Sequence, residues 1–232
     1  MAEDLIARAR AAGRRTLTEA EAKALLETIG ITTPESRVVE GVDEAVAAAE
    51  AIGYPVVVKV SAGEITHKSD WHDGSGVALD LRDESAVRAA ATEILDWLAQ
   101  TGVDGAILVE TAVETDRATE LILGAARTPS FGPTVLLGLG GVVAEALDDV
   151  SHRLAPLTEA DALEMMDELR GRVLLDGYRS QRPVDHERLA TAVVSLGELL
   201  VEHETIVEID VNPLVVGGGE PIALDALVVL EG

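Results

Sequence analysis

The amino-acid sequence predicts an α+β fold in two lobes. Helix-like and strand-like patterns alternate from Leu17 to about residue 105. Four apolar runs then follow at short spacing, which is typical of a mostly antiparallel sheet. The chain has 232 residues, of which 47% are hydrophobic, so it can form either one compact unit or two packed lobes.

The first lobe is expected to follow a surface helix near the N-terminus. Residues 1–15 lack the apolar region of a signal sequence. A helix begins at Thr18 and ends at Gly30, because glycine readily adopts the left-handed conformation of a helix end. Asp43 is expected to cap the next helix, which ends at Gly53. The predicted elements of the lobe are helix 18–30, strand 36–39, helix 43–53, strands 56–60 and 77–81, and helix 83–100.

Lys59 lies in the apolar, β-branched run at 56–60, which suits a strand buried on both faces. A buried lysine is costly unless its ammonium group meets an anion, so either a phosphate or a buried carboxylate is expected there. The alternative is a lysine at a strand end that reaches solvent. Residues 61–76 then form a long irregular segment rich in Gly, Ser, His and Asp, and such segments are often functional.

His67 and Lys68 lie in this irregular segment, followed by Ser69 and Asp70. A neutral imidazole is a good phosphoryl acceptor, and an adjacent lysine can neutralise phosphoryl oxygens. Taken alone, the tetrapeptide is more typical of a solvated polar loop. His72 is an alternative for any histidine role.

The second lobe is expected to contain a mostly antiparallel sheet and two helices. Its predicted elements are apolar runs at 106–113, 119–126, 134–140 and 142–147, helices at 158–169 and 185–203, and strands at 205–211 and 221–227.

Polar residues alternate along the strand at 205–211 and just beyond it. Glu208, Asp210 and Asn212 share one face, and Asp225 lies on the next strand. Carboxylate and amide oxygens suit Mg²⁺, with nucleotide phosphates and waters completing the octahedron. The alternative is a solvent-facing acidic strand edge.

A second set of polar positions lies near the end of the run at 106–113. The backbone at Ala112 and Val113, next to Glu110, could pair with an adenine edge, and Glu120 could bind ribose hydroxyls. Both positions are also common in purely structural roles.

The net charge of −24, from 42 acidic and 18 basic residues, repels nucleic acids and anionic lipid. No apolar stretch is long enough to span a membrane, and there is no cysteine for disulfides or thiolate metal sites. A cytoplasmic enzyme is therefore expected.

The composition also indicates a halophilic protein, since the chain is acidic, has only three lysines and has few aromatic residues. Concentrated salt screens the mutual repulsion of the negative charges. An acidic mesophilic protein is the alternative.

Nine short segments occur together in one order: PVVVKV-S at 55–61, I-x-HKSD at 65–70, G-V at 76–77, ELILG at 120–124, FGP at 131–133, G-x-GG-x-x-x-E at 138–145, D-x-x-x-R-L-A-P at 149–156, EID-x-NPL at 208–214 and ALDA at 223–226. From Leu17 to the C-terminus, the chain resembles the ATP-grasp β subunit or domain of ADP-forming acetyl-CoA and acyl-CoA synthetases. These are relatives of the succinyl-CoA synthetase β subunit.

The resemblance implies an ATP-grasp fold with the nucleotide between antiparallel sheets. Residues 1–16 would form an N-terminal helix on the C-terminal lobe, residues 17–105 one subdomain and residues 106–232 the other. For ATP or ADP, the resemblance implies that Lys59 holds the phosphates, that Glu110, Ala112 and Val113 form the adenine-binding hinge, and that Glu120 binds ribose.

The resemblance also implies a metal site and a phosphoryl relay. Asn212 and Asp225 match the Mg²⁺ ligands, with Asp210 nearby. His67, assisted by Lys68, matches a loop histidine that carries the phosphoryl group between a partner's phosphohistidine and the nucleotide.

The implied partner is an α subunit with CoA-binding and ligase domains, in an α2β2 assembly, so this chain should not make acyl-CoA alone.

Two departures from the family pattern stand out: residues 71–75 lengthen the loop, and Thr128 replaces a frequent Asp. Two alternatives remain open. One is another ATP-grasp carboxylate ligase that works without a phosphohistidine, and the other is a nucleotide-sensing module without catalysis.

Overall fold

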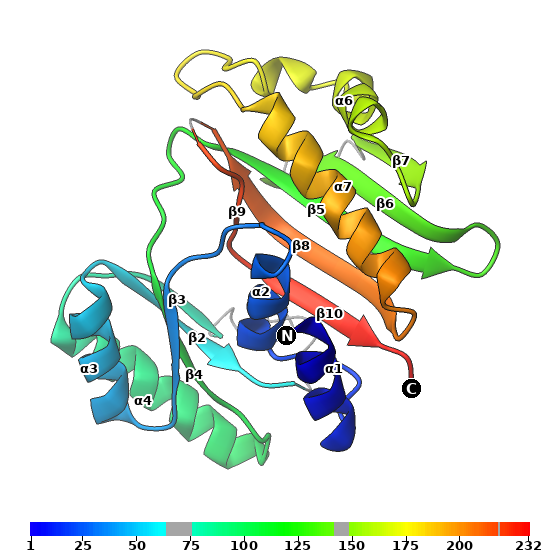
Figure 1. The fold of residues 1–232 in the computed structure, drawn as a ribbon. Helices are drawn as coiled ribbons and strands as arrows, with labels where there is room; N and C mark the ends of the chain where they lie inside the picture. Colours follow the sequence, from blue (N-terminus) through cyan, green and yellow to red (C-terminus); the bar gives the residue numbers. More distant parts are fainter. Residues whose placement is uncertain (64–75, 142–148, 218) are drawn as a thin grey trace. The chain divides into compact units, whose positions relative to one another are not determined.

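The computed structural model describes residues 1–63, 76–141, 149–217 and 219–232. The helices are α1 (Ala2–Ala11), α2 (Glu19–Glu27), α3 (Val42–Ile52), α4 (Glu84–Thr101), α6 (Glu159–Glu168), the short η3 (Arg172–Leu174) and α7 (His186–Glu202). The strands are β1 (Ser36–Val39), β2 (Val56–Ser61), β3 (Val77–Leu81), β4 (Ala106–Thr111), β5 (Thr119–Thr128), β6 (Gly132–Leu139), β7 (Val150–Leu154), β8 (Ile206–Val216), β9 (Ile222–Ala223) and β10 (Ala226–Leu230). Figure 1 shows their arrangement.

The chain forms two compact units. Unit 1 comprises Met1–Leu17, Glu21–Thr33 and Glu114–Gly232, and unit 2 comprises Thr18–Ala20 and Pro34–Val113. Each unit has its own antiparallel sheet and helices, so the predicted α+β class is confirmed. Among the described residues, no helix is both long and apolar enough to cross a membrane.

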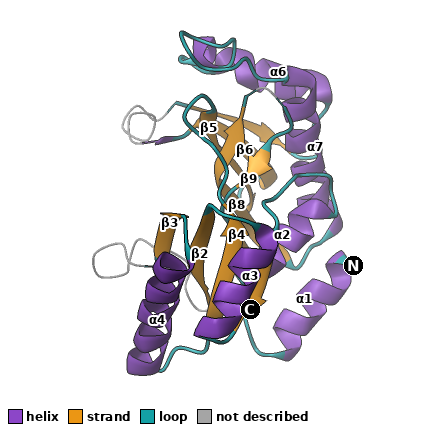
Figure 2. Cartoon of the chain, turned by 90° about the vertical axis from the view of Figure 1, so that its left-hand side faces the viewer, coloured by secondary structure: helices purple, strands orange, loops and turns teal. Residues whose placement is uncertain are grey.

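Unit 2 is a four-stranded sheet in the order β1-β4-β2-β3, with α3 and α4 side by side (Figure 1 and Figure 2). Its apolar core joins both helices to alternate residues of the two central strands, including Val58 and Val60 of β2 and Ile107 and Val109 of β4. Because side chains alternate along a strand, Lys59 points to the opposite face. The predicted burial of β2 is confirmed.

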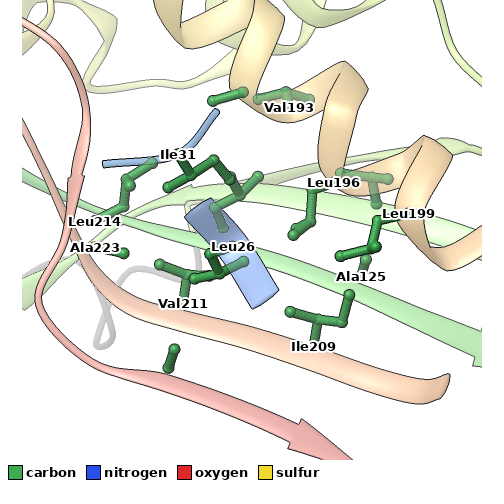
Figure 3. Close-up of a cluster of buried hydrophobic side chains, with 14 of the residues drawn as sticks. Leu26, Ile31, Ala125, Val193, Leu196, Leu199, Ile209, Val211, Leu214 and Ala223 are labelled. Atoms are coloured by element: carbon green, nitrogen blue, oxygen red, sulfur yellow. The ribbon is translucent and has the colours of Figure 1, made fainter. Parts of the chain in front are cut away.

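Unit 1 is built on a sheet in the order β10-β8-β5-β6-β7, with β9 paired to β8. Figure 1 shows α7 lying over this sheet and running in nearly the same direction as β8. Leu196 and Leu199 of α7 belong to the same buried cluster as Ala125 of β5 and Ile209 and Val211 of β8, as Figure 3 shows. The alternate residues of β5 and β8 therefore face away from this core.

Helix starts are predicted well where an acidic or hydroxyl cap is present. Asp83, Thr158 and Asp185 each immediately precede a helix, and each side chain accepts a hydrogen bond from a backbone amide in the first turn. Asp43 is an exception, because α3 begins one residue earlier, after Gly41. The prediction that Asp43 caps this helix is wrong; its carboxylate lies in the first turn, where negative charge is also favourable.

The strand predictions need two corrections. The run at 106–113 does not join the later runs in one sheet: its strand β4 pairs with β1 and β2 in unit 2. The run at 221–227 is divided into β9 and β10 at Leu224 and Asp225, so Asp225 does not lie on a strand as predicted; its carboxylate accepts a hydrogen bond from the Ala226 amide. Such local bonds compete with the strand ladder. The run at 142–147 lies outside the described residues, and β7 was not anticipated.

Candidate functional site

Lys59 is the centre of a buried charged cluster in unit 2. Its Nζ lies 2.6 Å from a carboxylate oxygen of Glu19 and 2.8 Å from one of Glu110. The three side chains are 8%, 3% and 2% exposed, respectively. The expectation that a buried lysine meets an anion is therefore confirmed, the anion being a pair of carboxylates, and the alternative of a solvent-reaching lysine is wrong.

The sheet register brings Lys59 and Glu110 together. Lys59 lies opposite Leu108, and Glu110 lies opposite Val57, so the two charged residues are diagonal neighbours on one face of the β2–β4 pair. Diagonal neighbours are within reach of long side chains. Glu19 comes from outside the sheet, since it is the first residue of α2. Two residues predicted to bind a nucleotide are thus in direct contact with each other.

The segment after β4 holds the other predicted hinge residues, Ala112 and Val113, both of which are partly exposed. The Ala112 amide donates a hydrogen bond to the Pro55 carbonyl at 3.1 Å, and the Thr111 amide donates to the Glu35 carbonyl at 2.9 Å. These bonds fix the backbone where it leaves the sheet. An adenine contact at Ala112 would therefore have to use its carbonyl.

The predicted metal residues meet on the face of the unit 1 sheet away from its core. Glu208 and Asn212 are exposed and Asp210 is half-buried, whereas the residues between them are buried, so the predicted shared face is confirmed. The Asn212 amide donates to the Asp225 carbonyl at 3.3 Å, which places Asp225 directly across from Asn212.

The chemistry of this group fits Mg²⁺ rather than a metal held wholly by protein. Within the described residues, no three His, Asp or Glu side chains form a metal-binding cluster. Asn212 and Asp225 would supply one amide and one carboxylate oxygen. Mg²⁺ commonly uses one or two carboxylates and takes its other ligands from phosphates and water. Gly124 lies beside Asp210 in the sheet and adds no side chain to this face.

Glu120 lines a cavity of about 450 Å³ within unit 1, together with Gly140, Arg170 and Gln181. The Gly140 amide donates to the Glu120 carbonyl at 2.7 Å. A Cβ atom on Gly140 would come within 3.0 Å of that carbonyl, so only glycine allows this approach. Leu139 and Leu174 also line the cavity, so its wall is partly apolar, and the ribose-binding role of Glu120 stays a prediction.

Three buried charged residues of the described chain have no role in the sequence predictions: Glu19, Lys23 and Asp149. Lys23, only 2% exposed, lies within α2. The scarcity of lysine could have identified Lys23, because it is one of only three in the chain. His67 and Lys68, together with the alternative His72, lie outside the described residues.

Known proteins resemble this chain over almost its whole length. The sequence profile of the ATP-grasp domain matches residues 8–230. The β subunit of acetate–CoA ligase (ADP-forming) I from Pyrococcus furiosus is 39% identical over 232 residues, covering 99% of this chain and 97% of that subunit.

Two solved structures of acetyl-coenzyme A synthetase 1 from Ca. Korarchaeum cryptofilum are similar in fold. One, in complex with coenzyme A and Ca-AMPCP, has a TM-score of 0.91, and the other, with coenzyme A and Mg-AMPPCP, has a TM-score of 0.84. Both are 38% identical to this chain and cover 100% of both chains. On sequence and fold together, the chain belongs to the ATP-grasp family.

Proposed function

We propose that this chain is the nucleotide-binding β subunit of an ADP-forming acetate–CoA or acyl-CoA ligase. It transfers a phosphoryl group between a phosphohistidine and ADP or ATP, with Mg²⁺. The observation that carries the proposal is the direct contact of Lys59 with Glu110 in unit 2. Two residues assigned to one ligand on sequence grounds are thereby neighbours in the fold, and the β subunit from P. furiosus matches the chain from end to end.

Each residue of the proposed site has a separate task. In unit 2, the Lys59 ammonium binds the nucleotide phosphates and offsets their charge, and the backbone from Glu110 to Val113 binds the adenine edge. In unit 1, the Glu120 carboxylate accepts hydrogen bonds from the ribose hydroxyls. Asn212 and Asp225, with Asp210 nearby, hold Mg²⁺, which would neutralise charge on the phosphate oxygens.

His67 is proposed to carry the phosphoryl group. An imidazole nitrogen attacks the terminal phosphorus, a P–N bond forms as the P–O bond to the nucleotide breaks, and ADP leaves; the reverse reaction makes ATP. Lys68 would stabilise the phosphoryl oxygens during transfer. Activity on the acid and on CoA is assigned to an α subunit with CoA-binding and ligase domains, in an α2β2 assembly. The name of the P. furiosus relative as a subunit supports such a partner.

We expect Mg²⁺ to strengthen ADP binding through Asp225. Titration calorimetry on the full chain compares the ADP affinity with Mg²⁺ to the ADP affinity without it. This ratio should be at least about tenfold smaller in Asp225→Ala than in wild type, because a carboxylate ligand is removed. Glu208→Ala is the matched control, since it removes an exposed carboxylate from the same face of β8 without touching the proposed ligands. Equal ADP affinity with and without Mg²⁺ in all three proteins would reject the metal site.

We expect His67→Asn to bind ADP and to fold normally but to lose phosphoryl transfer by about three orders of magnitude or more, because asparagine keeps hydrogen bonding without the nucleophile. The assay follows γ-labelled ATP into protein-bound phosphohistidine and into acyl-CoA turnover with the α subunit present. His72→Ala is the control and should stay close to wild type. Near wild-type turnover in His67→Asn, with loss in His72→Ala, would transfer the relay role to His72.

We also propose that the acidic surface adapts the protein to concentrated salt. The net charge of −24 should lower the melting temperature below about 0.1 M salt, where screening is lost. Thermal melts in sodium chloride, with sucrose of equal osmolarity as the uncharged control, measure this effect. A melting temperature that does not change with salt would contradict the halophilic interpretation.

A further inference from the structure

Residues 170–182 of unit 1 carry four arginines and one acidic residue, in a chain with 42 acidic and only 18 basic residues. One of the four, Arg172, is paired with an aspartate. The other three, Arg170, Arg179 and Arg182, are exposed, and in the part of the chain that the structure describes none of them forms an ion pair with a carboxylate. Uncompensated cationic side chains on an acidic molecule suit contact with a negatively charged surface.

Two acidic residues near this loop are directed at other groups. Asp176 Oδ1 lies 3.9 Å from His186 Nε2, and the Asp149 carboxylate accepts hydrogen bonds from the amides of Arg170 and Gly171, both at 2.8 Å. The exposed guanidinium groups therefore keep their capacity to bind carboxylates in the bidentate geometry that arginine favours.

Hydrogen bonds hold the backbone of the loop and bring a further exposed arginine to it. Arg117 Nε donates to the Ser180 carbonyl at 2.9 Å, and the Arg182 amide donates to the Arg117 carbonyl at 2.9 Å. Within the loop, the Gln181 amide donates to the Tyr178 carbonyl at 3.2 Å. A backbone that is already ordered lowers the entropy cost of binding a partner.

Tyr178 and Arg179 have the character of an interface hot spot. Tyr178 is 46% exposed, although aromatic residues make up only 2% of the chain, and the Arg179 guanidinium lies 5.2 Å from the centre of its ring. Tyrosine and arginine are enriched among the residues that dominate binding energy. Arg179 also has a φ of 58°, a left-handed conformation that favours glycine. An arginine in that conformation indicates a requirement for its side chain.

The loop borders the cavity that contains Glu120, because Arg170 and Gln181 both line it. None of the arginines at 8–15, the other arginine-rich segment, lines this cavity. Under the proposed function, the α subunit brings a phosphohistidine to the nucleotide, so it must dock beside the nucleotide site. Nucleic acid is a poor alternative, because the net charge of −24 repels it.

We propose that an arginine patch, formed by Arg117, Arg170, Tyr178, Arg179 and Arg182, is the docking surface for an acidic face of the α subunit. This inference rests on the proposed function and adds where that partner binds. The guanidinium groups orient the partner through its carboxylates, and Tyr178 supplies apolar contact at the same place.

Arg179→Gly separates docking from folding. Glycine adopts a φ of 58° without strain, so this variant should melt at or above the temperature of wild type while losing the side chain that docks. Its affinity for the α subunit should fall about tenfold. If Arg179 had a structural role only, the substitution would leave that affinity unchanged.

The test uses titration calorimetry of the full chain with the α subunit that co-purifies with it from native cells, at one salt concentration. We expect Tyr178→Ala and Arg182→Glu each to weaken α binding about tenfold or more, with ADP affinity in the absence of the α subunit changed less than about twofold. Arg10→Glu makes the same change of charge at an exposed arginine of α1 and is the matched control. It should bind the α subunit as wild type does.

Wild-type α affinity in Arg179→Gly, or equal losses in Arg182→Glu and Arg10→Glu, would overturn the docking role. If the patch instead joins copies of this chain, Arg182→Glu would dissolve an oligomer of the chain alone and keep α binding, which would also overturn it. Arg179→Gly remains decisive if another variant fails to fold, because it relieves strain. Failure of the wild-type chain to bind any α subunit would contradict the proposed function itself, and the docking role with it.

Discussion

The requirement that a buried ammonium group be paired with negative charge governs the site in unit 2. Lys59 is on a strand whose neighbouring residues form an apolar core with α3 and α4, so its side chain must point to the opposite face. An unpaired charge there would be far too costly. Glu110 meets Lys59 only because β4 pairs antiparallel with β2 in this register, and Glu19 meets it only because α2 begins where it does. Sheet register, helix start and ion pairing are thus interdependent, and a shift of one residue in either strand would move a charge into the core.

The same alternation works differently in unit 1, where one face of the sheet is covered by an apolar core and the other carries polar groups. Leu121 and Leu123 of β5 are buried, whereas Glu120 is exposed. On β8, Asp210 and Asn212 lie on the polar face, and Asp225 is held opposite Asn212 by a backbone hydrogen bond. Two protein oxygens in this arrangement match the limited number of protein ligands that Mg²⁺ uses beside phosphates and water. The strand periodicity that builds the core therefore also places Asp210 and Asn212 on one face, and the short connection between β9 and β10 adds Asp225.

Much of the site follows from local sequence, and what does not follow depends on distant contacts. The buried β-branched run predicted an anion at Lys59, and the period of two predicted that Glu208, Asp210 and Asn212 share a face. The identity of the anion was not predictable, because Glu19 lies 40 residues from Lys59 in the chain. The sheet to which β4 belongs was missed for the same reason, since strand pairing is not encoded in the pattern of one strand. Asp43 failed as a cap because acidic residues are favourable both at a cap and in the first turn, and the sequence alone does not separate the two.

The proposed function requires that Lys59, held in its carboxylate cluster, meets the nucleotide phosphates. The chain has only three lysines, so nuclear magnetic resonance of isotope-labelled lysine side chains gives few signals, and a Lys59→Arg chain assigns the one from Lys59. The account predicts that the Nζ resonance of Lys59 shifts as ADP and Mg²⁺ are added, that the shift saturates with the binding isotherm, and that adenosine causes much less change. A Lys59 resonance that stays unchanged while the chain is saturated with ADP would contradict the central claim.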